Sequence, residues 1–174
     1  MMIDNLSYAR VVCFTDTLSF YGVILTGKRR LRDLLNDRTT EYVELGDVEV
    51  YKVHDPDVLF HRTQELFLRK SSLVLVVIQI EVSQTPASRL FSYVDKQRHD
   101  AVLFLPTYEV RGTLHLTGKY QVHGPLAAEG EAFIPVTNAQ ATAVLNTRVK
   151  LQADTVLVRQ DAINAFYVAE GGTV

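Results

Sequence analysis

The stretch Leu66-Phe67-Leu68-Arg69-Lys70-Ser71-Ser72-Leu73 is matched ninety residues later by Val156-Leu157-Val158-Arg159-Gln160-Asp161-Ala162-Ile163. The apolar positions, the arginine and the final aliphatic residue coincide without a gap. Upstream, residues 42–50 run parallel to residues 133–141 and Gly22 corresponds to Gly112, with one inserted residue between these blocks. A period near ninety residues is too long for a solenoid repeat, so the pattern predicts two copies of one small domain.

The composition is that of an ordinary globular protein. Of the 174 residues, 47% are apolar and 22% charged, and the net charge is −2, which argues against a surface devoted to nucleic acid. Cys13 is the single cysteine, so no intrachain disulfide can form, as is usual in a reducing compartment. The first residues lack the pattern of a secretory signal, and the longest apolar run, residues 73–78, is too short to cross a bilayer. We therefore expect a cytoplasmic protein without membrane contact.

Segments of strand-type composition alternate with short turns. Val, Ile, Leu, Thr and aromatic residues are concentrated in residues 10–14, 20–26, 41–53, 73–82, 101–105, 108–116, 132–144, 155–159 and 163–169. Thr26-Gly27-Lys28 and His54-Asp55-Pro56-Asp57 have the composition of turns. The pattern predicts a mainly β protein.

One short helix is expected in residues 28–38. Leu31, Leu34 and Leu35 recur there at the i, i+3, i+4 spacing of an amphipathic helix. The corresponding residues 120–130 lack this spacing and contain Gly124-Pro125, which predicts a loop. The two copies therefore differ in this element.

Five strands and a bend at a glycine in each copy predict two tandem small β-barrels of the SH3 or Sm type. Closure would remove the free sheet edges of so short an all-β unit. The expected barrels span residues 1–82 and 100–170, and residues 83–99 form a linker or connecting element. Within it, residues 89–99 are compatible with either a short helix or a strand.

The end of each copy resembles the second signature of Sm proteins. Leu68-Arg69-x-x-x-Leu73 and Val158-Arg159-x-x-x-Ile163 follow its order of aliphatic residue, arginine, turn and aliphatic residue. In Sm proteins a basic residue of that turn faces RNA at the pore of a ring, which implies RNA contact for Arg69 and Arg159. The glycine that follows in Sm proteins is replaced here by Lys70 and Gln160.

The segment Arg30-Leu31-Arg32-Asp33-Leu34-Leu35-Asn36 resembles an uncharacterised family of small bacterial proteins that carries R-L-x-D-[FL]-L-N. The resemblance covers most of the first copy, and Gly22, Arg30, Asp33 and Asn36 match its pattern. The second copy keeps the corresponding strand and the glycine, as Gly112, but not the R-L-x-D-L-L-N element. We expect the three leucines to close one end of the barrel, and Asp33 and Asn36 to cap backbone N–H groups.

Lys28-Arg29-Arg30-Leu31-Arg32 is the one dense basic run of the chain. It is suited either to phosphate contact or to a solvated helix face balanced by the acidic residues that follow. No aromatic residue is interleaved with the run, which weakens the case for stacking on single-stranded bases.

No catalytic constellation is apparent. The five histidines lack the close pairing of a zinc site, so neither a metal nor another cofactor is predicted. His54 and Asp57 could be imagined as an acid/base pair of a hydrolase, but a turn explains them more simply. Cys13 lies between Val12 and Phe14, which favours a buried, unreactive thiol.

The sequence therefore predicts a non-catalytic binding or assembly module that contacts a protein partner or further copies of itself. The alternative is an RNA- or nucleotide-binding module. Its contacts would be Lys28, Arg29, Arg30, Arg32, Arg69 and Arg159.

Overall fold

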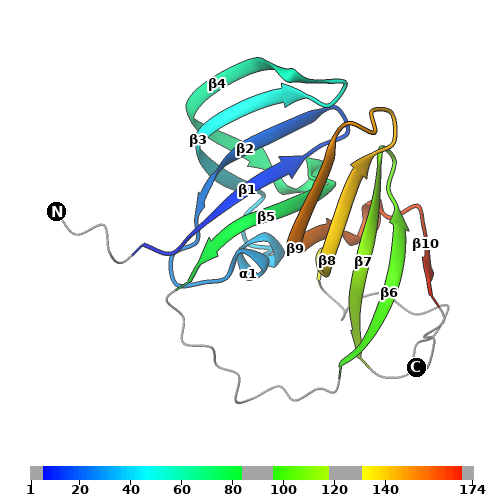
Figure 1. The fold of residues 1–174 in the computed structure, drawn as a ribbon. Helices are drawn as coiled ribbons and strands as arrows, with labels where there is room; N and C mark the ends of the chain where they lie inside the picture. The colour runs from blue at the N-terminus through cyan, green and yellow to red at the C-terminus, as the bar shows by residue number, and fades with distance from the viewer. Residues whose placement is uncertain (1–5, 84–95, 118–130, 170–174) are drawn as a thin grey trace.

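The structure is a computed structural model that describes residues 6–83, 96–117 and 131–169. It is mainly β (Figure 1). The first half of the chain forms β1 (Tyr8–Phe14), β2 (Leu18–Leu25), helix α1 (Leu31–Asn36), β3 (Tyr42–Lys52), β4 (Asp55–Arg69), the 3-10 turn η1 (Lys70–Ser72) and β5 (Leu75–Val82). The second half forms β6 (Lys96–Phe104), β7 (Tyr108–Thr117), β8 (Phe133–Ala143), β9 (Lys150–Arg159), the 3-10 turn η2 (Gln160–Ala162) and β10 (Ala165–Val168).

The strands belong to one open sheet. Across the described ranges its ten strands follow the order β10-β6-β7-β8-β9-β5-β1-β2-β3-β4. Within each half the order is the same, with the fifth strand beside the first and the fourth at the far side. The two closed barrels expected from the sequence are therefore wrong. The fifth strand of the first half does not close onto β4, because it pairs instead with β9 of the second half.

The junction between the halves is short and antiparallel. Leu75, Val76, Val77 and Ile78 of β5 face Val158, Leu157, Val156 and Thr155 of β9. Figure 1 shows β5 and β9 side by side between the two sets of strands. The two halves are thus joined within one sheet, independently of the chain segment that connects them.

Both halves contain the same bulge opposite a glycine. The β2–β3 register shifts around Gly22, and the β7–β8 register shifts around Gly112. Opposite these glycines, Asp47 and Asn138 have φ angles of 49° and 48°, in the left-handed region. A Cβ at Gly112 would lie 2.7 Å from Val136 Cγ1, so this close approach of the strands requires glycine there.

Two cores lie on opposite faces of the central strands. In β1, Val11 and Cys13 belong to one core while Val12 and Phe14 belong to the other. Each core also contains residues of both halves: Phe133 and Leu157 join the core of α1, and β1 and β5 side chains join the core of the second half. Strands buried on both faces read as continuous apolar runs rather than alternating ones, as residues 11–14 of β1 and 75–77 of β5 do.

Several boundaries differ from the expectation. The helix is confirmed over Leu31–Asn36, shorter than residues 28–38. β6 begins at Lys96, so residues 96–99 of the expected linker are strand, while residues 84–95 and the expected loop 120–130 lie outside the described residues. The turn expected at residues 54–57 is formed by Val53 and His54, and Asp55 already starts β4. No helix in the described ranges is long and apolar enough to cross a membrane.

Candidate interaction site

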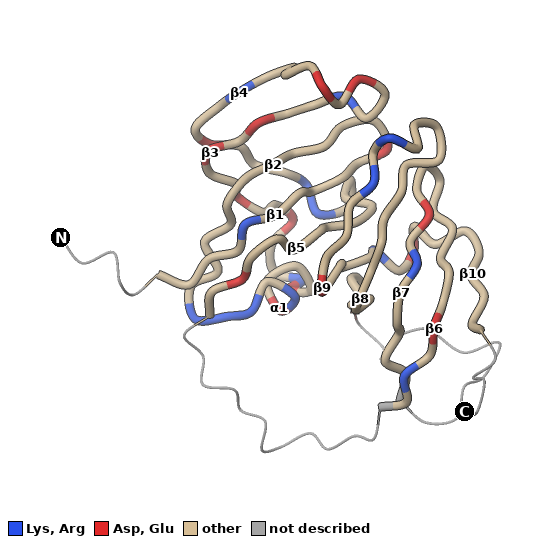
Figure 2. Tube along the Cα trace, in the orientation of Figure 1, with Lys and Arg blue, Asp and Glu red and all other residues tan. Residues whose placement is uncertain are grey.

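The basic run leads into α1, and two of its four basic residues pair with carboxylates. Arg29 Nη1 donates to Asp37 Oδ2 at 2.5 Å, and Arg32 Nη2 contacts both carboxylate oxygens of Glu131 at 2.6 and 2.7 Å. Arg30 is the exposed N-cap residue of α1, and Lys28 precedes it on the surface. In Figure 2 the basic run is a blue stretch of the tube that leads into α1. The contacts favour the solvated, balanced interpretation of the run.

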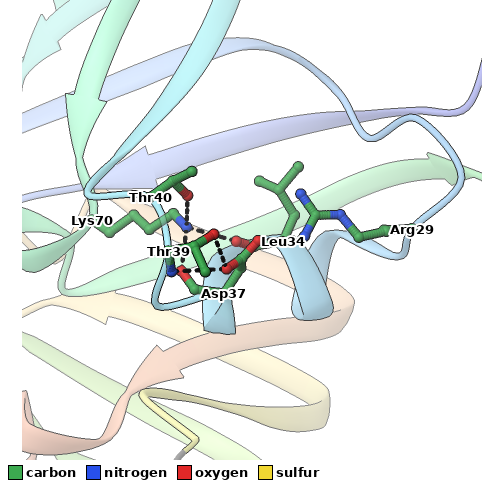
Figure 3. Close-up of polar contacts among 6 residues, drawn as sticks. All are labelled: Arg29, Leu34, Asp37, Thr39, Thr40 and Lys70. Atoms are coloured by element: carbon green, nitrogen blue, oxygen red, sulfur yellow. Dashed lines mark hydrogen bonds and ion pairs between the residues drawn. The ribbon is translucent and has the colours of Figure 1, made fainter.

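Asp37 organises the loop that follows α1. Its Oδ1 accepts hydrogen bonds from the Thr39 N–H at 2.9 Å and from Thr39 Oγ1 at 2.6 Å (Figure 3). These bonds, together with the Arg29 guanidinium, hold the pKa of the Asp37 carboxyl well below its usual range. The charged carboxylate of Asp37 therefore stabilises this loop.

Lys70 closes the C-terminal end of α1, a role that the sequence did not reveal. Its Nζ donates to the carbonyls of Leu34 at 2.7 Å and Asp37 at 2.9 Å, and to Thr40 Oγ1 at 2.7 Å (Figure 3). The side chain is buried, and desolvation lowers its pKa. A lysine at the C-terminus of a helix satisfies carbonyls that have no partner within the helix. Lys70 therefore has a structural role at this end of the helix.

The R-L-x-D-L-L-N segment has a structural role in the packing of α1. Leu31 and Leu35 are buried, and Leu34 packs against the same core. The Leu31 N–H donates to Glu81 Oε1 of β5 at 2.7 Å, which satisfies one free donor of the helix N-terminus. Asp33 is exposed on the helix and does not act as its N-cap.

Asn36 caps backbone groups, as expected, but those of the distant β8. Its Nδ2 donates to the carbonyl of Phe133 at 3.0 Å, and its Oδ1 accepts from the Phe133 N–H at 2.8 Å. The side-chain amide thus pairs with β8 in the way that a neighbouring strand would. The helix of the first half is thereby attached to the second half.

Arg69 and Arg159 hold equivalent positions at the ends of β4 and β9. Arg69 Nη2 donates to the Tyr42 hydroxyl at 2.6 Å, lies over the Tyr42 ring and pairs with Glu41 at 3.5 Å. Arg159 Nε lies 2.8 Å from Asp161 Oδ1. The two arginines therefore lie beside different local groups, as do Arg29 and Arg32. The six predicted basic residues are not gathered around a common anion site by these contacts.

The residues considered for catalysis have structural surroundings. His54 is exposed in a turn, and Asp57 pairs with Arg148 of the second half at 2.8 Å. Cys13 is fully buried, and burial raises the pKa of its thiol to about 12, so the thiolate is scarce at neutral pH. No group of three metal-ligating side chains occurs in the parts of the chain that the structure describes.

The free edge of β4 is the most distinctive surface of the molecule. β4 spans fifteen residues and, among the residues that the structure describes, pairs only with β3. Most of it is exposed, and its apolar side chains Val58, Leu59, Phe60 and Phe67 face solvent. At the opposite end of the sheet, β10 pairs with β6 alone within the described ranges, and its Tyr167 is exposed. Strand-type composition did not indicate β4 in the sequence; only its end at Arg69 was implied, by the resemblance to the Sm signature.

Comparison with known proteins gives no further assignment. No family model, curated protein or solved structure matches the chain significantly. The resemblances to Sm proteins and to the R-L-x-D-[FL]-L-N family therefore stay predictions.

Proposed function

We propose that the protein is a non-catalytic assembly module that binds a strand of a protein partner, or of a further copy of itself, at the free edge of its sheet. The observation that carries the proposal is the exposed edge of β4 with its apolar side chains. An edge strand presents unpaired backbone N–H and C=O groups, and a partner strand can pair with them.

The residues of β4 divide the edge into a protected and an unprotected part. Asp55, Pro56 and Asp57 stand at its beginning, and charges and proline are the usual protection of an edge against unwanted pairing. Leu66, Phe67 and Leu68, near its end, offer no such protection. The end of β4 is therefore the part suited to a partner strand.

We also infer that the two halves arose by duplication of a five-strand unit. The common strand order, the paired bulges at Gly22 and Gly112 and the equivalent turns η1 and η2 support this origin. One unit already pairs with the other through β5 and β9. A strand of one such unit can therefore pair with a strand of another, as β5 and β9 do.

RNA or nucleotide binding remains the second candidate, but its support is weaker. The carboxylate partners of Arg29, Arg32, Arg69 and Arg159 reduce the positive potential that phosphates would meet. Binding would require phosphates to displace these carboxylates.

The proposal is tested by sedimentation velocity of the full chain over a wide range of concentration. We expect species heavier than the 19.6 kDa chain, and a return to that mass in Phe67→Lys, which places a charge on the edge. Leu145→Lys, at an even more exposed position outside the strands, is the matched control and should assemble like wild type. Wild-type protein that stays at 19.6 kDa throughout would contradict self-assembly.

A further inference from the structure

The junction between β5 and β9 gives a pattern for contact between chains. Because the two halves share one strand order, β4 is the equivalent of β9 and β10 is the equivalent of β5. In the internal junction β9 is covered by β5. The equivalent strand of the first half, β4, is at one end of the sheet, and β10, the equivalent of β5, is at the other end. We propose that a second copy of this chain covers β4 with its β10 and so repeats the β5–β9 junction between chains. This inference rests on the assembly function proposed above and names its partner.

The repeat fixes the register of the proposed contact. Val76 faces Leu157 and Val77 faces Val156 in the internal junction. The β5 residues correspond to residues ninety positions later in β10, and the β9 residues to residues ninety positions earlier in β4. The same register therefore places Phe166 of one chain opposite Phe67 of the next, and Tyr167 opposite Leu66. Ala165 then faces Leu68, and Val168 faces Glu65. The four residues of β10 match the four pairs of the internal junction.

Side chains on the free edges are much more exposed than their equivalents in the internal junction. Phe67 is 60% exposed, whereas its equivalent Leu157 is 1% exposed. Tyr167 is 53% exposed, whereas its equivalent Val77 is 2% exposed. Leu157 and Val77 are buried where β5 and β9 lie together, and burial of large apolar side chains is the main favourable term in association. Large apolar residues at the free positions are thus suited to the same kind of burial.

Backbone groups beside β10 are held as they are beside β5. The Val74 N–H donates to the Phe14 carbonyl at 2.8 Å, and the equivalent Asn164 N–H donates to the Phe104 carbonyl at 2.8 Å. In the internal junction the Val74 carbonyl also accepts from the Arg159 N–H at 3.0 Å. The Asn164 carbonyl is therefore positioned to accept the N–H of Arg69 of a second chain, which would extend the contact beyond the four residue pairs.

The proposed contact is asymmetric, because it joins two different strands. β4 of one chain meets β10 of the next, so each added chain presents a new free β4 or β10. A head-to-tail interface of this kind closes into a ring when its rotation permits and otherwise gives a filament. The rival arrangement is a two-fold contact of β4 with β4, which would leave every β10 free.

Disulfide trapping between separately prepared variants, each with one introduced cysteine, tests the register. Phe67→Cys is mixed with Phe166→Cys, and Leu66→Cys with Tyr167→Cys, under mild oxidation, and covalent dimers are measured by non-reducing electrophoresis. We expect dimers in both mixtures and not in either variant alone. The mixture of Phe67→Cys with Tyr167→Cys is the control, because a shift of one residue directs the two side chains to opposite faces. The native Cys13 is buried and should not react.

The outcomes separate this inference from the assembly function. Dimers in Phe67→Cys alone would overturn it in favour of the two-fold contact of β4 with β4. Heavy species in sedimentation without dimers in either in-register mixture would also overturn it, while the assembly function would stand. A wild-type chain that neither sediments as a larger species nor forms any trapped dimer would overturn both.

Discussion

Asn36 and Phe133, ninety-seven positions apart, exchange two hydrogen bonds at 3.0 and 2.8 Å. The side chain of a short helix thereby pairs with the first residue of β8 as a strand backbone would. The pair links the motif segment of the first half to the second half. Its loss should therefore lower the free energy of unfolding of the whole chain.

Asn36→Asp keeps the acceptor for the Phe133 N–H and replaces the donor to its carbonyl with a carboxylate oxygen. We expect the free energy of unfolding to fall by about 1–3 kcal/mol, the usual cost of an unsatisfied buried group. Urea denaturation measures the change, and Asp33→Asn on the exposed face of the same helix is the control. Equal midpoints for the two variants would show that the pair adds nothing to stability.

Gly112→Ala should destabilise the chain more than Gly22→Ala. The new Cβ would lie 2.7 Å from Val136 Cγ1 and 2.8 Å from the Thr137 carbonyl oxygen, whereas at Gly22 its nearest neighbour is the Gly46 oxygen at 3.1 Å. We expect a loss of about 1–3 kcal/mol at Gly112, typical of overpacking, and a smaller one at Gly22. Thermal unfolding checks the order, with Gly46→Ala as a control whose nearest neighbour is 3.8 Å away.

Asp37 should make stability depend on pH in the acid range. Its pKa in the folded chain is lowered by Thr39 and Arg29, so the unfolded chain binds a proton more readily. The stability contributed by the carboxylate is therefore complete above its ordinary value of 3.8 and is lost as the pH falls below it. The difference in unfolding free energy between wild type and Asp37→Asn should shrink as the pH is lowered from neutral through this range. A constant difference would show that Asp37 does not titrate as described.

Binding of labelled single-stranded RNA should be weak and insensitive to the basic run. Arg29 already pairs with Asp37, and Arg32 with Glu131, so we expect similar fluorescence anisotropy titrations for wild type and for the Arg29→Ala/Arg30→Ala double variant at low salt. Low-salt affinity that falls by orders of magnitude in high salt and is lost in the variant would instead establish phosphate contacts.

Most of the strands and the helix were predicted from the sequence, whereas the composition of β4 did not indicate a strand. Its residues 61–65, His61-Arg62-Thr63-Gln64-Glu65, carry polar side chains on both faces. The hydrophobic alternation that identifies a half-buried strand is therefore missing. β4 is held by backbone pairing with β3, which leaves little mark on composition.

The open sheet could not be distinguished from closed barrels because the decisive contact lies between the halves. Val76 and Val77 would be apolar in a barrel, and they are equally apolar when they face β9. The role of Lys70 was hidden for a similar reason. Its partners Leu34, Asp37 and Thr40 lie thirty or more positions upstream, and two of the three acceptors are backbone carbonyls with no sequence signature.

The double burial of β1 has a consequence for how the chain unfolds. Val11 and Cys13 support one core while Val12 and Phe14 support the other, so damage to either core removes packing from the same strand. The two halves then have no independent melting transitions, and calorimetry should record one cooperative event. A protein with two similar halves would in this way respond to heat as a single unit.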